Sequence, residues 1–285
     1  MAEAVVRVAA LGDLHCTRTS QGAFQPLFTR ITETADVLLL AGDLTDLGLP
    51  EEARVLAREF AALRVPVAAV LGNHDFEAGK EKEIREIVAE AGVTVLDGDA
   101  CELHGIGIAG VKGFCGGFGQ RALSPWGEGM IKQFVREAVD EALKLETALA
   151  RLRTKHLVAL MHYAPIKQTV DGEPLEIYPF LGSSRLEEPL SRFPVSFVVH
   201  GHAHRGRTDG VTQNGVPVYN VSMPLLGRMF ADRQPFRLFE VSAQNAAPKH
   251  APATQPTSAP PAEPVPEPGS RGEPTGPVLM RERRG

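Results

Sequence analysis

The 285-residue chain has few cysteines, few aromatic residues and no long apolar run. Its three cysteines (Cys16, Cys101 and Cys115) lie far apart without Cys-x-x-Cys spacing, which excludes a dense disulfide framework and a cysteine zinc site. No apolar run approaches the roughly 20 residues that a membrane span needs. The first residues lead directly into a strand-like run and lack the basic and small-residue pattern of a signal peptide. We therefore expect a cytoplasmic protein with no membrane partner.

An excess of basic charge is also absent. The chain has 30 Lys and Arg residues against 35 Asp and Glu residues, for a formal net charge of −5. Duplex nucleic acid is bound by basic surfaces that neutralise its phosphates, so no dedicated duplex-binding surface is expected. A nucleotide substrate is compatible with this charge.

The composition changes near residue 246. From there to residue 285 the chain contains ten of its 22 prolines and almost no large apolar residue. Such a segment cannot bury enough surface to offset the entropy lost on ordering. We predict one domain over residues 1–243 and a disordered, proline-rich tail over residues 246–285.

The domain alternates apolar runs with helical patterns. Continuous apolar runs predict buried strands at 5–11, 37–40, 67–71, 157–161 and 195–199, with shorter strands at 93–96, 106–111, 216–221 and 236–241. Helical patterns occupy residues 50–63, 80–91 and 131–152. This alternation predicts an α/β fold in which helices cover the sheets.

A short polar motif follows each of the five longer apolar runs. In chain order the motifs are Asp13-Leu14-His15, Gly42-Asp43-Leu44-Thr45-Asp46, Gly72-Asn73-His74-Asp75, Met161-His162-Tyr163-Ala164-Pro165 and Gly201-His202-Ala203-His204. Ligands of open α/β sheets gather beyond the carboxyl ends of the strands, so we expect these side chains to converge.

The residue types in these motifs suit a site for two metal ions. Asp13 and His15 are two residues apart, so on an extended strand end they would point to the same side. Asp43 could bridge two cations through its two oxygens. Neutral oxygen and imidazole ligands complete the set: Asn73, His162, His202 and His204. This mixture of nitrogen and oxygen donors is typical of Mn, Fe, Zn or Co. Two such ions about 3.5–4 Å apart would clamp a phosphoryl group.

The five motifs, in this order, resemble the signature of the calcineurin-like metallophosphoesterase superfamily. The resemblance implies a four-layer αββα sandwich with two mixed β-sheets. It also implies two divalent ions, of Mn, Fe or Zn, each held by four side chains that include a shared Asp43. The first ion would be bound by Asp13, His15, Asp43 and His204, and the second by Asp43, Asn73, His162 and His202.

The resemblance assigns a catalytic role to His74. This residue would contact the substrate phosphate and protonate the leaving oxygen, while Asp46 holds its imidazole in place; Asp75 is the alternative partner. The implied reaction is hydrolysis of a phosphate ester through attack by hydroxide that bridges the two ions.

Comparison with members of the superfamily narrows the range of expected substrates. Leu47 follows Asp46 where protein phosphatases of the superfamily have arginine, so a phosphoprotein substrate is disfavoured. The Gly-Asp-Leu-Thr-Asp and Gly-Asn-His-Asp motifs and the His-x-x-Pro setting of His162 look more like bacterial phosphodiesterases of the cyclic-nucleotide type. A small phosphodiester, such as a nucleotide, is therefore favoured over a monoester. Tyr178 and Arg185 follow His162 closely and are predicted substrate contacts, together with Asn73 and His74. The glycine-rich segment 111–129, with Arg121 and Trp126, is either a mobile flap or a packed loop.

A second hypothesis is an inactive scaffold that retains metal and recruits a partner through the proline-rich tail. The intact ligand set and His74 disfavour it. The sequence makes no prediction of oligomeric state.

Overall fold

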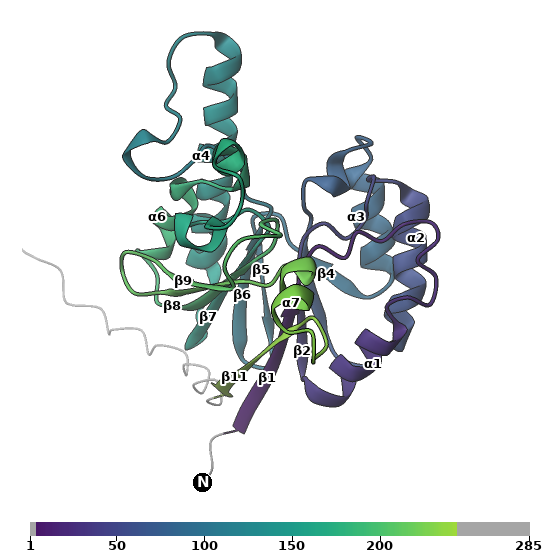
Figure 1. The fold of residues 1–285 in the computed structure, drawn as a ribbon. Coiled ribbons are helices and arrows are strands. Elements are labelled where there is room, and N and C mark those ends of the chain that lie inside the picture. The colour runs from purple at the N-terminus through teal and green to yellow at the C-terminus, as the bar shows by residue number, and fades with distance from the viewer. Residues whose placement is uncertain (1–3, 244–285) are drawn as a thin grey trace, which may run out of the picture. The chain divides into compact units, whose positions relative to one another are not determined.

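Two mixed β-sheets form the centre of the fold in the computed structural model, which describes residues 4–243 (Figure 1). The first sheet has the order β11-β1-β2-β3-β4 and contains β1 (Ala4–Leu11), β2 (Val37–Ala41), β3 (Val67–Val70), β4 (Val93–Val95) and β11 (Arg237–Ala243). In this sheet β11 is antiparallel to β1 and the other pairs are parallel. The tail predicted for residues 246–285 lies outside the described residues.

The second sheet has the order β5-β6-β7-β8-β10-β9. Its strands are β5 (Asp99–Leu103), β6 (Ile106–Val111), β7 (His156–Met161), β8 (Val195–His200), β9 (Asp209–Val211) and β10 (Pro217–Asn220). The central pairs are parallel, and the two edge strands β5 and β9 pair antiparallel. The parallel strands therefore end together at one edge of each sheet.

Helices cover the outer face of each sheet. Those on the first sheet are α1 (Gln25–Thr34), α2 (Pro50–Glu59) and α3 (Glu81–Glu90), and those on the second are α4 (Gly129–Arg151) and the short α6 (Glu187–Leu190). Two short helices, α5 (Tyr178–Leu181) and α7 (Met223–Met229), lie in connections. None of the helices in residues 4–243 is both long and apolar enough to cross a membrane.

The strand β2 shows why the predicted strands are continuously apolar. Leu38 and Leu40 pack toward the helices, whereas Leu39 packs into a core shared by the two sheets. Because successive side chains of a strand point to opposite faces, a strand buried on both faces needs apolar residues throughout. The shared core contains Val8 from the first sheet and Val158 from the second, so the sheets pack face to face. The four-layer αββα prediction is confirmed.

Some elements differ from the sequence prediction. Helix α1 and strands β5 and β9 were not predicted, and the helix predicted for 50–63 ends at Glu59, followed by a 3₁₀ turn at Phe60–Ala62. Helix α1 buries only Leu27, Phe28 and Ile31, an apolar stripe too short to stand out in the sequence.

Candidate metal centre

The five predicted motifs meet where the parallel strands of the two sheets end. Three groups of side chains could each hold a metal ion, because within each group the ligand atoms lie within 4.8 Å of one another. The groups are Asp13, His15, Asp43 and His204; His15, Asp46 and His74; and Asp43, His162 and His202. Members of the first group are separated by up to 191 residues in the chain. The fold thus brings together side chains from all five motifs.

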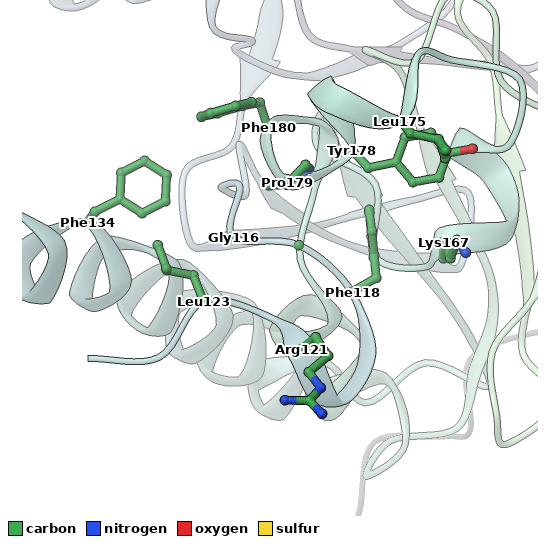
Figure 2. Close-up of a pocket in the computed structure, with 11 residues that line it drawn as sticks. Gly116, Phe118, Arg121, Leu123, Phe134, Lys167, Leu175, Tyr178, Pro179 and Phe180 are labelled. Carbon is green, nitrogen blue, oxygen red and sulfur yellow. The ribbon is translucent and has the colours of Figure 1, made fainter. Parts of the chain in front are cut away.

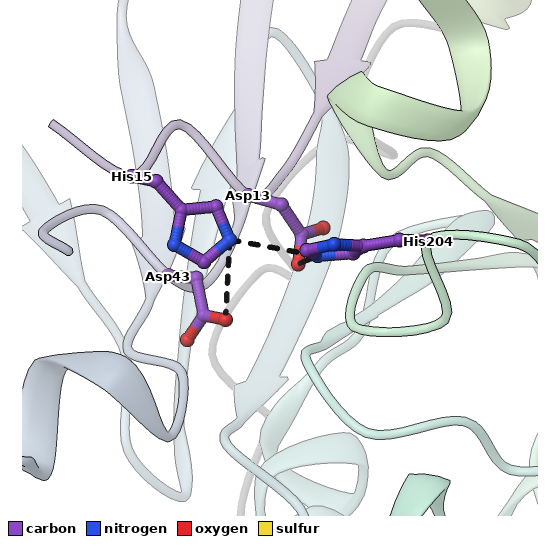
Figure 3. A group of neighbouring side chains, drawn as sticks. All are labelled: Asp13, His15, Asp43 and His204. Carbon is purple, nitrogen blue, oxygen red and sulfur yellow. Dashed lines mark hydrogen bonds and ion pairs between the residues drawn. The ribbon is translucent and has the colours of Figure 1, made fainter. Parts of the chain in front are cut away.

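The four side chains of the first group lie close to one another (Figure 3). His204 Nε2 lies 2.9 Å from Asp13 Oδ1 and 3.5 Å from His15 Nε2. His15 Nε2 also lies 3.8 Å from Asp43 Oδ2. Donor atoms held about 2.1 Å from one ion at angles near 90–110° are roughly 3.0–3.5 Å apart. Of the three spacings, 3.5 Å lies within this range, 2.9 Å just below it and 3.8 Å above it, so small side-chain movements would bring these donors onto one cation.

The second group uses the other oxygen of Asp43. His162 Nε2 lies 3.3 Å from Asp43 Oδ1 and 2.9 Å from Asn73 Oδ1. The His202 ring lies beside that of His162, with 4.8 Å between the ring centroids. The two oxygens of Asp43 therefore face different groups, as a carboxylate that bridges two ions requires.

Main-chain carbonyls fix the tautomers of two histidines. His162 Nδ1 donates to the carbonyl oxygen of Ala41 at 2.9 Å, and His202 Nε2 donates to the carbonyl oxygen of Phe180 at 3.1 Å. A carbonyl can only accept, so each of these ring nitrogens carries a proton. His162 Nε2 and His202 Nδ1 are therefore the unprotonated ring nitrogens, the form in which imidazole binds metal.

The backbone of the predicted ligands is strained. Positive φ angles of 59°, 44°, 48° and 70° occur at Asp13, His15, Asp43 and His202. The left-handed region costs an ordinary residue roughly 1–2 kcal/mol, and such strain gathers at functional sites. Strand β1 ends at Leu11, so the expected extended placement of Asp13 and His15 is wrong; a left-handed loop brings them together instead.

Glycines in three motifs allow the loops to approach one another. A Cβ on Gly42 would lie 2.5 Å from His162 Nδ1. A Cβ on Gly72 would overlap the Asp43 carboxylate, and one on Gly201 would overlap that of Asp13. Each glycine therefore leaves room for a predicted ligand from another loop.

The buried charges and imidazoles of the site would be stabilised by a cation. Burial raises the pKa of Asp43 to about 9, and the neighbouring carboxylates of Asp13 and Asp75 add to the shift. Burial lowers the pKa of His202 to about 3 and that of His162 well below its usual range. Buried carboxylates beside neutral imidazoles are a donor set that a divalent cation neutralises.

His74 lies beside this set, with its ring centroid 4.5 Å from that of His15. The contact expected with the Asp46 carboxylate differs in the structure, because His74 Nδ1 donates to the main-chain carbonyl of Asp46 at 2.6 Å. The Asp46 carboxylate instead lies 3.4 Å from His15 Nδ1. Asp46 thus contacts both histidines, one through its main chain and one through its side chain.

The fully buried Asp75 does not hold His74, so that alternative is wrong. Its carboxylate accepts hydrogen bonds from the backbone N–H groups of Leu44, Thr45 and Gly72 and from the Thr45 hydroxyl. These bonds join the loop after β2 to the loop after β3. Asp75 therefore fixes the position of Asp43 relative to Asn73.

Comparison with known proteins identifies the family. The calcineurin-like phosphoesterase family matches residues 6–206. The chain belongs to this family. The comparison with curated proteins found no match.

Two solved structures support the fold of this calcineurin-like phosphoesterase. Phosphopantetheinyl hydrolase from Mycobacterium tuberculosis is similar with a TM-score of 0.60 and 17% identity, over 88% of this chain and 100% of the other. TT1561 of Thermus thermophilus is similar with a TM-score of 0.51 and 16% identity, over 85% of this chain and 100% of the other. Members of the family typically use divalent metals, and the His and Asp groups described above suit such ions.

The two predicted substrate contacts of this phosphoesterase, Tyr178 and Arg185, have different positions relative to one cavity. Tyr178 lines a cavity (Figure 2), and its hydroxyl donates to Asp171 Oδ1 at 3.3 Å. The Arg185 guanidinium donates to the carbonyl of Leu123 at 3.3 Å. Arg185 therefore holds the wall of that cavity and does not line it.

Some contributors to the site have no distinctive pattern in the sequence. The main-chain carbonyls of Ala41 and Phe180 orient the predicted metal ligands His162 and His202, but a residue of any type has such a carbonyl. The buried His200 precedes the last motif and supports its loop. Its Nδ1 donates to the Gly201 carbonyl and its Nε2 hydrogen-bonds with the Thr169 hydroxyl, both at 2.8 Å.

Proposed function

We propose that this chain is a dinuclear-metal-dependent phosphoesterase that hydrolyses small phosphodiesters in preference to monoesters. The observation that carries the proposal is the pair of His and Asp groups that share Asp43, with His74 beside them. Nucleotides are the leading substrate class. The three free cysteines agree with a cytoplasmic location.

The residues would divide between two cations. Asp13, His15 and His204 would hold one, and Asn73, His162 and His202 the other, with Asp43 shared. Their mixed donors suit Mn, Fe or Zn. When bound, the two ions would neutralise charge on the phosphoryl group and lower the pKa of a water molecule between them.

The geometry of His74 suits a proton donor. Its Nδ1 is committed to the Asp46 carbonyl, so Nε2 is the nitrogen that gains and loses a proton. A protonated Nε2 can give that proton to the leaving oxygen as the phosphorus–oxygen bond breaks. Asp46 is the positioning residue, because its carbonyl keeps the ring in this orientation.

The first test is hydrolysis of bis(4-nitrophenyl) phosphate and of 4-nitrophenyl phosphate, with added Mn²⁺ and then with chelator. We expect metal-dependent turnover that favours the diester. A monoester preference would contradict the phosphodiesterase assignment. No turnover of either substrate by protein with bound metal would favour the inactive-scaffold hypothesis.

The role of His74 is tested by His74→Ala. We expect kcat to fall by about 10²–10⁴ while metal content is kept. His156→Ala is the matched control, because His156 begins β7 at the end opposite His162. Loss of metal from His74→Ala would make His74 a ligand, and an unchanged kcat would remove its role as proton donor.

A further inference from the structure

A cavity of about 450 Å³ is lined by residues of two loops (Figure 2). Its volume falls in the range of roughly 300–1,000 Å³ that is typical of small-molecule sites. Two segments far apart in the sequence form its walls, one around residues 116–123 and the other around residues 175–180.

Backbone hydrogen bonds hold the two walls together. Gly116 N donates to Pro179 O at 2.7 Å, and Gly117 N donates to Gly182 O at 2.9 Å. The second wall is joined to the loop after His162, because Ala164 N donates to Leu181 O at 3.0 Å. The cavity is therefore built into the fold.

Two contacts connect the cavity to the metal centre. The carbonyl of Phe180, a lining residue, accepts the hydrogen bond from His202. The rings of Phe118 and Tyr178 pack against a small apolar cluster that includes Ala203, between His202 and His204. A substrate held at the metal centre could therefore extend one arm into the cavity.

The walls are apolar and partly unprotected from water. Besides Phe118 and Tyr178, the ring of Phe180 lines the cavity and is 57% exposed, and Leu175 is 73% exposed. Stacking on such rings is how proteins bind bases without reading their sequence. A planar group fits these walls.

The charged groups of the lining are all positive. Within the described part of the chain, Arg121 and Lys167 line the cavity and no Asp or Glu does so. Neither cation forms an ion pair with a described residue, whereas Arg136 and Lys144 on the adjacent α4 are paired with acidic side chains. In a chain of net charge −5, an acid-free lining with two unpaired cations favours an anion.

We infer that this cavity binds the leaving arm of a linear nucleotide diester, with the base against the exposed ring of Phe180 and a second phosphate beside Arg121 or Lys167. The inference rests on the proposed function. Such a cavity would favour substrates that carry a second anionic group besides the scissile phosphate. A cyclic mononucleotide has only the scissile phosphate and leaves both cations without a partner.

The dinucleotides pApA and ApA test the inference because they differ only in the 5′-phosphate of the leaving arm. The oxygen of a water molecule adds to the phosphorus of the internal diester as the bond to the 3′-oxygen breaks. His74 gives its proton to that oxygen and regains one from solvent, so pApA and one water give two molecules of AMP. We expect kcat/KM to be about tenfold higher for pApA than for ApA, as one phosphate contact implies. This preference should fall toward unity in the double variant Arg121→Gln, Lys167→Gln.

Arg136→Gln is the matched control, because it removes an exposed arginine of α4 outside the cavity. It should keep the wild-type preference. Equal kcat/KM for the two dinucleotides in the wild type, or an unchanged preference in the double variant, would overturn the inference. Failure to hydrolyse bis(4-nitrophenyl) phosphate would instead refute the proposed function.

Binding of AMP to chelator-treated protein gives a readout that needs no turnover. We expect the Kd to rise about tenfold in Phe180→Ala, from the loss of one stacking contact. Phe180 is largely exposed, so this variant should fold, and its carbonyl remains in place for His202. Absence of AMP binding in the wild type, or an equal Kd in Phe180→Ala and wild type, would overturn the inference.

Discussion

Comparing Gly42→Ala with a control variant separates two effects of an added Cβ at the metal centre. One is the strain of a left-handed backbone, and the other is the clash with the neighbouring His162. Gly42 has a φ of +83°, and an added Cβ would lie 2.5 Å from His162 Nδ1 and 2.7 Å from His162 Cγ. Gly105→Ala is the matched control, with a φ of +80° and nothing within 4 Å of its Cβ. Both variants share the backbone strain, and only the first displaces His162.

The expected magnitudes follow from these contacts. The left-handed conformation costs either variant roughly 1–2 kcal/mol. In Gly42→Ala the crowded ring adds about 1–3 kcal/mol, and loss of its bond to Ala41 adds about 1 kcal/mol. We expect unfolding free energies lowered by about 3–6 kcal/mol for Gly42→Ala and about 1–2 kcal/mol for Gly105→Ala.

The assay is urea unfolding in the presence of chelator, followed by metal analysis of protein reloaded with Mn²⁺. Gly105→Ala should bind as much metal as the wild type. Gly42→Ala should bind at least tenfold more weakly, because the His162 ring can no longer keep its orientation. Equal losses of stability and equal metal binding in the two variants would refute this account of Gly42.

Three further predictions concern groups outside the reaction. Asp75→Ala should lower the unfolding free energy by about 3 kcal/mol or more, because three buried N–H groups lose their acceptor; a loss below about 1 kcal/mol in urea would contradict it. Burial raises the pKa of Cys101 and of Cys115 from 9.0 to about 11, so their native reaction with a disulfide reagent near pH 8 should be about 100-fold slower than in urea, and equal rates would be inconsistent with burial. The hydrogen bond from Arg7 lowers the pKa of Asp36 below 3.8 in the folded protein. The stabilisation from the ionised Asp36 carboxylate is therefore present above the pKa of Asp36 in the unfolded chain, and it is lost as the pH falls through its pKa in the folded protein. The stability difference between wild type and Asp36→Asn should therefore shrink on acidification below about pH 4, and a difference that grows would argue against this ion pair.

The elements that could be predicted from the sequence are those whose packing requires a regular apolar pattern, which is continuous in the buried strands and periodic in helices α2, α3 and α4. Strand β2 is buried on both faces, so its run of leucines directly reflects its place inside a sheet. Strand β9, at the edge of its sheet, has exposed ends at Asp209 and Val211 and no such pattern. Its pairing with β10 depends on the fold around it and not on its own residues.

The candidate site divides in the same way. Side chains such as Asp43 and His204 could be predicted because the residue type determines their chemistry. The carbonyl of Phe180 and the left-handed turn at His15 could not, because main-chain contacts arise from loops that meet only in the folded chain. The same holds for the segment 111–129: its part near Gly117 is a packed loop bonded to residues 182–184, while Trp126 is 61% exposed.

The central claim is that catalysis requires two cations held around Asp43. The most direct test is hydrolysis of bis(4-nitrophenyl) phosphate by chelator-stripped protein as Mn²⁺ is added, with bound Mn²⁺ counted at every point. The account predicts that turnover rises until two ions are bound per chain and then stays constant. Full turnover with one ion per chain, or none with two, would contradict it.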